Sequence, residues 1–252
     1  MIARAKTFEG FPRLSGALAL CSVICSVACA STPPASSSPT APSSGPSAVP
    51  ATVGESQAQN GVSMFVVHLV RDFDSFKKYF EEGADARTRA GIKGHLLTRL
   101  DDGRVVVHLF ADDVVKVQEV LKSPEMERYL DRKDAPETSL LWLTENKFVK
   151  VPATPPIGPT FSLFLKLSVT DFAALDRGFR DNLPLFAEHA VIGEGLHQSF
   201  GRDIVILHFT GTSREKLDAL VKRPEFEQLL ARAGSQGELK PLVGVDVSRS
   251  RP

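Results

Sequence analysis

The chain beyond residue 60 alternates between strand-like and helix-like patterns of apolar residues. In its first half, four runs have the two-residue period of a β-strand: MFVVHLV (64–70), HLLTRL (95–100), VVVHLF (105–110) and SLLWLTE (139–145). Asp72 lies where a helix N-cap is expected, and phenylalanines follow at helical spacing until Gly91. A second helix is predicted over about 113–131, restarting at Ser123-Pro124. The predicted order is β-α-β-β-α-β.

The second half of the chain gives the same order. Its strands are predicted at SLFLKLSV (162–169), LHQSF (196–200), DIVILHF (203–209) and LVGVDV (242–247). Apolar residues from Phe172 to Phe186 indicate a helix that Pro184 is expected to break or kink. Thr212-x-x-Glu215 has the spacing of a capping box for the last helix.

A sequence repeat accounts for this recurrence. The segment Val105–Leu130 resembles Val205–Leu230, one hundred residues later. A repeat of this length predicts an internal duplication. We therefore expect two units, 61–151 and 158–249, joined by a proline-rich segment. Units of about ninety residues have small cores, so we expect the two to pack together.

Strand alternation separates the two faces of each predicted sheet, because successive residues point to opposite sides. The face expected under the helices carries Val66, His68, Val70, Leu96, Thr98, Leu100, Val105, Val107 and Leu109, with Leu165, Leu167, Val169, Leu196, Gln198, Phe200, Val205, Leu207 and Phe209. The opposite face carries Phe65, Val67, Leu69, Leu97, Arg99, Val106, His108 and Phe110, with Phe164, Lys166, Ser168, His197, Ser199, Ile206, His208 and Thr210. Two sheets packed on this mixed face would enclose an interior suited to a small, largely apolar molecule.

Two β-α-β-β-α-β units, a VVVHLF third strand and a following helix that contains Lys-Ser-Pro-Glu resemble the dimeric α/β-barrel superfamily. The resemblance covers about 61–249 and implies an α+β fold in which two ferredoxin-like units pack sheet to sheet. Because both units belong to one chain, it implies a monomer with an internal pseudo-dimer. The superfamily includes antibiotic-biosynthesis monooxygenases, polyketide cyclases, muconolactone isomerases and haem-binding relatives of chlorite dismutase and dye-decolourising peroxidases. Such a resemblance implies a fold and does not select one activity.

His108 and His208 are the first candidate site, since they occupy equivalent positions and are expected to face one interior from opposite sheets. Neutral imidazole can act as a general base or as a ligand to haem or a metal. The alternative is two buried histidines that only hydrogen-bond their neighbours. No ligand motif accompanies them, so no metal is predicted and no cofactor is required. If haem binds, its axial ligand is His108, His208, His197 or His95.

Three further polar residues could fix an anionic or carbonyl-bearing ligand inside the barrel: Arg99, Lys166 and His197. His108 would then be the base of a cofactor-independent reaction. In the alternative interpretation Arg99 is exposed near its hairpin and Lys166 extends to the rim of the barrel.

The charge balance excludes one class of partner. Thirty basic and thirty acidic residues give a pI near 7.0, whereas nucleic-acid binding needs a clustered positive excess. Neither G-x-G-x-x-G nor G-x-x-x-x-G-K-[ST] occurs, so no phosphate-binding loop is predicted.

The N-terminal residues 1–29 have the pattern of an export signal: a basic start and the uncharged run Leu14–Ala28. The sequence Ser26-Val27-Ala28-Cys29 resembles a bacterial lipobox, which makes Cys29 the predicted lipidation site. The alternative is ordinary signal cleavage after Ala30, giving a secreted soluble protein. Residues 30–60 are rich in Pro and Ser and are predicted to be a disordered tether.

Together these patterns predict an exported, lipid-anchored protein of the cell envelope that binds a small apolar molecule between its two sheets. The first alternative is an enzyme of the monooxygenase, cyclase or isomerase type that uses His108 or His208. The others are a haem-binding protein and a non-catalytic envelope protein that binds other proteins.

Overall fold

The computed structural model describes residues 61–124, 137–152, 154, 156–200, 203–236 and 239–250. Within them the strands are β1 (Val62–Leu69), β2 (Ile92–Leu100), β3 (Arg104–Ala111), β4 (Glu137–Lys150), β5 (Phe161–Ser168), β6 (Val191–Ser199), β7 (Ile204–Gly211) and β8 (Leu242–Ser250). The helices are α1 (Phe73–Glu82), α2 (Ala84–Arg89), α3 (Val114–Leu121), α5 (Phe172–Asp181), α6 (Leu183–Glu188), α7 (Arg214–Leu220) and α8 (Pro224–Arg232). The signal segment and the tether lie outside the described residues.

The eight strands form one closed barrel in the order β1-β3-β2-β8-β5-β7-β6-β4. Each unit contributes a ferredoxin-like sheet, β4-β1-β3-β2 from the first and β8-β5-β7-β6 from the second. The last strand of each unit then pairs with the other unit: β4 with β6, and β8 with β2. The predicted fold, two tandem ferredoxin-like units forming an intramolecular α/β barrel, is confirmed.

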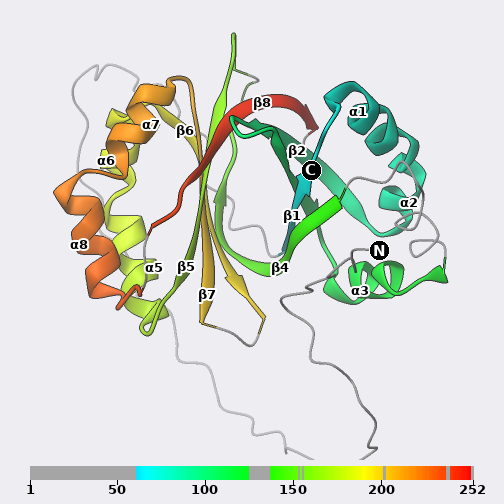
Figure 1. The fold of residues 1–252 in the computed structure, drawn as a ribbon. Helices are drawn as coiled ribbons and strands as arrows, with labels where there is room; N and C mark the ends of the chain where they lie inside the picture. Colours follow the sequence, from blue (N-terminus) through cyan, green and yellow to red (C-terminus); the bar gives the residue numbers. More distant parts are fainter. Residues whose placement is uncertain are drawn as a thin grey trace, which may run out of the picture. The chain divides into compact units, whose positions relative to one another are not determined.

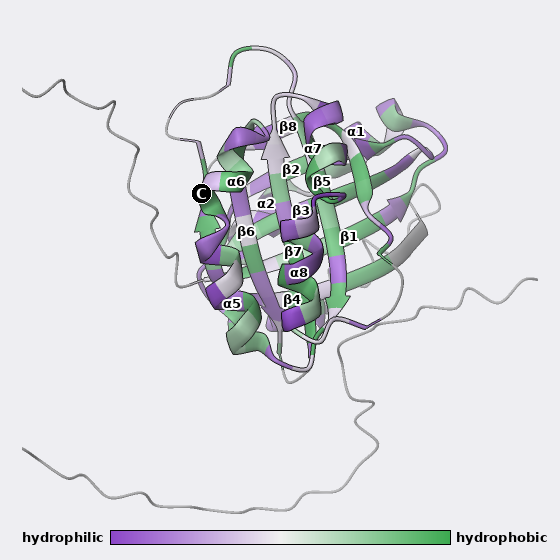
Figure 2. Cartoon of the chain, turned by 90° about the vertical axis from the view of Figure 1, so that its left-hand side faces the viewer, coloured by the Kyte–Doolittle hydropathy of each residue, from purple (hydrophilic) through white to green (hydrophobic). Residues whose placement is uncertain are grey.

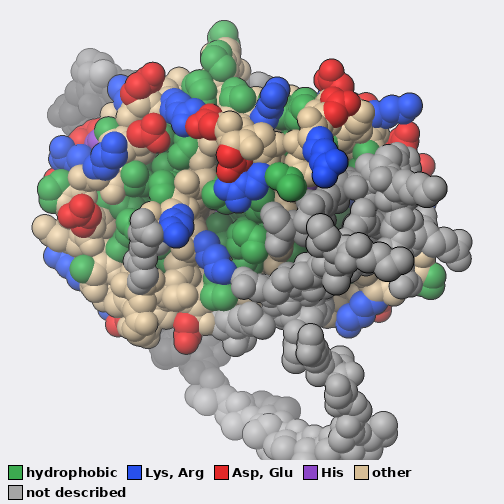
Figure 3. Space-filling view, viewed as in Figure 1, with side chains coloured by type: hydrophobic (Ala, Val, Ile, Leu, Met, Phe, Trp, Pro, Cys, Tyr) green, Lys and Arg blue, Asp and Glu red, His purple; other side chains and the backbone are tan. Residues whose placement is uncertain are grey.

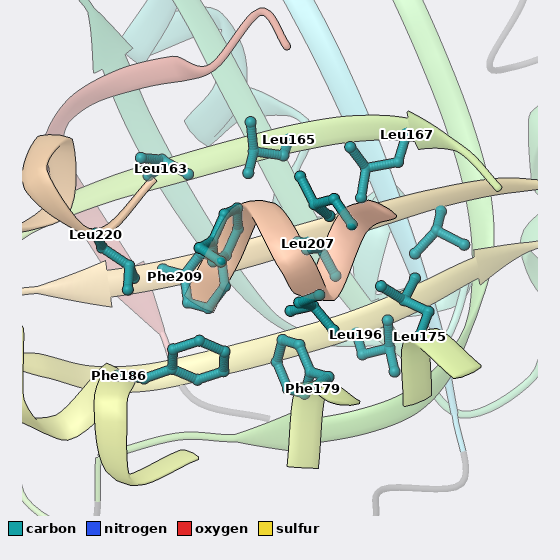
Figure 4. Close-up of a cluster of buried hydrophobic side chains, with 14 of the residues drawn as sticks. Leu163, Leu165, Leu167, Leu175, Phe179, Phe186, Leu196, Leu207, Phe209 and Leu220 are labelled. Carbon is teal, nitrogen blue, oxygen red and sulfur yellow. The ribbon is translucent and has the colours of Figure 1, made fainter. Parts of the chain in front are cut away.

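The helices cover the outer faces of the two sheets, α1 to α3 on the first unit and α5 to α8 on the second (Figure 1). Figure 2 shows the second unit from outside, where the helices carry hydrophilic residues and the strands beneath are largely hydrophobic. Under these helices, the rings of Phe179, Phe186 and Phe209 pack together, with centroids 4.9 to 5.9 Å apart (Figure 4). Within the described residues, no helix combines the length and apolar character required to cross a membrane.

Local signals in the sequence set most helix boundaries correctly. The Asp72 carboxylate accepts a hydrogen bond from the Asp74 N–H at 3.1 Å, so the predicted N-cap of α1 is confirmed. The predicted break at Pro184 is also confirmed, because α5 ends before it and Pro184 lies in the first turn of α6. The predicted capping box at Thr212 is wrong by one residue. Ser213 caps α7 instead, with its Oγ accepting from the Lys216 N–H.

The two units differ by one residue in the hairpin before β3 and β7. His108 lies opposite Leu96 on β2, whereas His208 lies opposite Gly195 on β6. Equivalent residues are therefore 99 positions apart up to this hairpin and 100 positions apart after it. The extra residue belongs to the connection 200–203, compared with 101–103 in the first unit.

The extra residue shifts the alignment of β2 with β6 by one position, and a one-residue shift exchanges the two faces of a strand. The predicted faces of β2 are therefore wrong, whereas those of β6 are correct. Leu100 packs in the barrel interior and Leu96 lines its pocket. Leu97 packs under the first unit's helices, and the Arg99 guanidinium lies 5.5 Å from the ring centroid of Phe73. Arg99 is therefore not a group of the barrel interior.

Candidate functional site

Three histidines meet at the centre of the barrel, from β3, β6 and β7. The ring centroid of His108 lies 5.1 Å from that of His208 and 5.3 Å from that of His197. Phe65 stacks on His108 at 4.1 Å, and Phe164, its equivalent in the second unit, stacks on His208 at 4.6 Å. Apolar side chains fill the rest of the centre: Val67, Leu100, Val106, Trp142 and Ile206.

On the first unit's side, the hydrogen bonds define the tautomers of two histidines. Ser63 Oγ donates to Asn146 Oδ1 at 2.8 Å, so His108 Nε2 must donate to Ser63 Oγ at 2.9 Å. His197 Nδ1 donates to the same Asn146 Oδ1 at 2.8 Å. The other nitrogens, His108 Nδ1 and His197 Nε2, are buried and have no hydrogen-bond partner among the residues that the structure describes. Both are then the unprotonated nitrogens of buried, neutral imidazoles.

On the second unit's side, Asp246 occupies the position of Asn146. It accepts hydrogen bonds from Thr98 Oγ1 at 2.8 Å, from Thr160 Oγ1 at 2.7 Å and from Arg249 Nη2 at 3.2 Å. His208 Nε2 contacts two hydroxyls separately from this network, those of Ser162 at 3.3 Å and Thr210 at 3.2 Å.

Burial keeps these histidines neutral. Desolvation lowers the pKa of His197 to about 3. Desolvation also lowers the pKa of His108 and of His208 well below the usual range, with smaller contributions from neighbouring histidines and from the positive charge of Arg249. At neutral pH the three imidazoles are therefore uncharged, and they hydrogen-bond the hydroxyl and amide groups named above.

A pocket of about 480 Å³ lies at the end of the barrel where β4 and β8 finish. The strand registers direct Leu96, Phe110 and Val149 into it from the first unit. The second unit contributes His208, Thr210, Asp246 and Arg249. The face of the molecule seen in Figure 1 carries interspersed basic, acidic and hydrophobic side chains (Figure 3). His208 is 7% exposed and reaches this pocket, whereas His108 and His197 are fully buried behind it.

The remaining predicted residues lie elsewhere. Lys166 Nζ is 5.4 Å from the ring centroid of Trp142, and Lys166 does not line the pocket. The ring of His95 packs against Phe80 at 5.1 Å, on the helix side of β2. The site thus brings together His108, His197 and His208 and leaves Arg99 and Lys166 apart.

Sequence reasoning did not single out several polar groups of this site, among them Asn146 and Arg249 near the ends of the fourth strands. The predicted fourth strands ended at 145 and 247, whereas β4 and β8 continue beyond them. Each strand also has a register irregularity, between Asn146 and Phe148 in β4 and at the matching place in β8. Aligning NKFVK (146–150) with DVSRS (246–250) would have indicated both positions.

The histidines considered as haem ligands do not fit that role through Nε2. In His95 this atom contacts Ser248 Oγ at 3.0 Å, and in His108 and His208 it is bonded to the hydroxyls named above. His197 Nε2 is buried against Gly195, where a Cβ would lie 2.2 Å from it. None of the four presents a free Nε2 to the pocket. Among the described residues, no three His, Cys, Asp or Glu side chains form a group that could hold a metal ion.

No family model and no curated protein matches this chain. Its fold is similar to that of several solved structures. A candidate monooxygenase from Fusobacterium nucleatum is 8% identical, with a TM-score of 0.57 over 75% of this chain and 93% of that one. An anthrone oxidase-like protein is 13% identical, with a TM-score of 0.57 over 78% and 95%. A candidate chlorite dismutase is 12% identical, with a TM-score of 0.51 over 75% and 95%. At these identities the likeness concerns the fold alone.

Proposed function

We propose that this chain binds a small, largely apolar molecule in the pocket at the β4 and β8 end of the barrel. The supporting observation is the pocket itself, in which an apolar wall of Leu96, Phe110 and Val149 faces the polar groups of His208 and Arg249. A mainly apolar cavity with a few convergent polar groups is the usual form of a small-molecule site, and its volume lies in the usual range.

Binding without reaction fits this geometry better than catalysis. An enzyme of the monooxygenase, cyclase or isomerase type would act through His208, since His108 and His197 do not reach the pocket. The Nε2 of His208 is already shared by the hydroxyls of Ser162 and Thr210, and its pKa is lowered by burial. These two features make His208 a weak base at neutral pH.

Substitution of Thr210 by Phe is expected to weaken ligand binding strongly. In the first unit Phe110 occupies the equivalent position, with its ring centroid 4.1 Å from that of His108. A phenylalanine at 210 should therefore be tolerated by the fold while it fills the pocket. We expect at least a tenfold loss of affinity, about 1.4 kcal/mol, for the uncharged dye N-phenyl-1-naphthylamine measured by fluorescence titration.

Thr212→Phe is the matched control, because it adds the same side chain at an exposed position just beyond β7. Equal dye affinity in wild type and T210F would contradict the proposal. Native mass spectrometry of protein purified from its source supplies a second test. A small molecule lost in T210F supports the proposal, whereas recovered haem would contradict the arrangement of the histidines described above.

We further propose that the chain is exported and anchored through a lipid on Cys29, so that the tether 30–60 holds the barrel near a membrane. Mass spectrometry of the mature N-terminus should find a lipidated Cys29 as the first residue. Cys29→Ser should release the protein from membranes into the soluble fraction. A wild-type chain that begins at Ser31 would overturn the anchor.

A further inference from the structure

The two walls of the pocket come from the two copies of the duplicated unit, and they differ in chemistry at equivalent positions. Leu96 corresponds to Gly195, Phe110 to Thr210, and Val149 to Arg249. In each pair the first unit supplies an apolar side chain, and the second supplies a glycine or a polar group. At these three positions the duplication has therefore made the first unit's side of the pocket apolar and the second unit's side more polar.

Given the proposed function, we infer that the bound molecule is amphipathic and carries a carboxylate that pairs with Arg249, while its apolar body lies against Leu96, Phe110 and Val149. The register of β2 and β8 places Arg249 directly opposite Leu96. A headgroup at Arg249 is thus next to the apolar wall. The planar guanidinium matches the geometry of a carboxylate and binds it with two parallel hydrogen bonds.

Asp246 holds the Arg249 guanidinium in place without occupying all of it. Of the guanidinium nitrogens of Arg249, Nη2 contacts Asp246 Oδ2, at 3.2 Å, and the Asp246 side chain is 4% exposed. Asp246 also accepts from Thr98 and Thr160, which fix its orientation. Among the described residues, the remaining N–H groups of Arg249 donate no hydrogen bond, and its side chain is 26% exposed. These donors are available to a ligand.

The positive charge of Arg249 lies in the lining of the same pocket as His208. It is one of the causes that lower the pKa values of His108 and His208. Lys150 also lines the pocket, together with its partner Glu194. Lys150 pairs with Glu194 at 3.0 Å, and Glu194 lies opposite Phe209, a residue of the helix-facing core. Lys150 is thus paired within the lining, whereas Arg249 lies opposite Leu96 on the neighbouring strand.

The test compares three probes that share one apolar chain: decanoate, 1-decanol and decylammonium. Dissociation constants for wild type, Arg249→Gln and Arg249→Lys are measured by displacement of N-phenyl-1-naphthylamine. We expect wild type to bind decanoate at least tenfold more tightly than 1-decanol, and decylammonium most weakly. R249Q should lose this tenfold preference and keep its affinity for 1-decanol within twofold. R249K, which retains charge but not the planar donor pair, should fall between them.

Lys166→Gln is the control, because it removes an equal charge outside the pocket and should leave all three affinities unchanged. Thermal unfolding of each variant checks the fold, and R249K replaces R249Q if the latter does not fold. Equal affinities for decanoate and 1-decanol, or a decanoate affinity unaffected at position 249, would overturn the carboxylate inference. The proposed function would survive that result if T210F still lowered the dye affinity at least tenfold. Unchanged dye binding in T210F would instead contradict the proposed function itself, whatever the result at position 249.

Discussion

Acidification is expected to unfold this protein, because three histidines that are neutral in the folded barrel become charged when the chain unfolds. Burial lowers the pKa of His197 to about 3 and the pKa values of His108 and His208 well below the ordinary range. In the unfolded chain a histidine titrates near 6.5. Below that pH the unfolded state binds more protons than the folded state, so stability falls as pH falls.

The size of this effect follows from linkage. Above about pH 6.5 these groups leave the free energy of unfolding unchanged. Below it, each histidine removes about 1.4 kcal/mol of stability per pH unit until the pH reaches its folded pKa. For His197 this window extends down to about pH 3. A domain of ordinary stability is therefore expected to unfold well before these groups titrate in the folded state.

Urea unfolding at several pH values between 8 and 4.5 measures this dependence. His197→Gln should reduce the slope of stability against pH by about 1.4 kcal/mol per pH unit, the share of one histidine. His189→Gln is the control, because His189 lies outside the barrel at the end of α6. If H197Q retained the slope of wild type, the neutral, buried state of His197 would be refuted.

Gly195→Leu is expected to be strongly destabilising, by about 3 kcal/mol, because the site cannot accommodate a side chain. A Cβ at Gly195 would lie 2.2 Å from His197 Nε2. The imidazole has little room to move, since it is fully buried, bonded to Asn146 and packed edge-on against Phe65 at 5.0 Å. Urea unfolding at pH 8 measures the loss.

The first unit suggests how the loss can be repaired. There the residues equivalent to Gly195 and His197 are Leu96 and Thr98, a large and a small side chain in the opposite arrangement. Thr98 Oγ1 donates to Asp246 as His197 Nδ1 donates to Asn146. The double variant G195L/H197T should therefore recover most of the stability lost in G195L.

A double-mutant cycle measures this compensation. His197→Thr alone should cost about 2 kcal/mol, because it leaves a cavity beside Gly195. The two substitutions should couple by about 2 to 3 kcal/mol in the favourable direction. Additive losses would contradict the equivalence of the two pairs and the 99-residue offset on which it depends.

The sequence alone determined the features that depend on local chemistry and on the repeat. The two-residue period placed the strands, and Asp72 and Pro184 set helix ends, because caps and prolines act on their own neighbours. The repeat predicted two β-α-β-β-α-β units and the equivalence of His108 and His208. The choice between reaction and binding, and the export of the chain, stay predictions.

Tertiary structure decided how the units close and where the pocket lies. The two-residue period shows that a strand has two faces, but it does not show which face lies inside the barrel. Because the second unit's hairpin has one extra residue, aligning the two units by the repeat exchanges the inner and outer faces of β2. Strand ends and register irregularities direct Val149 and Arg249 inward, and pairing of β4 with β6 and of β8 with β2 brings them to one site. Such long-range pairings leave no local pattern in the sequence, because the partners lie in different units of the chain.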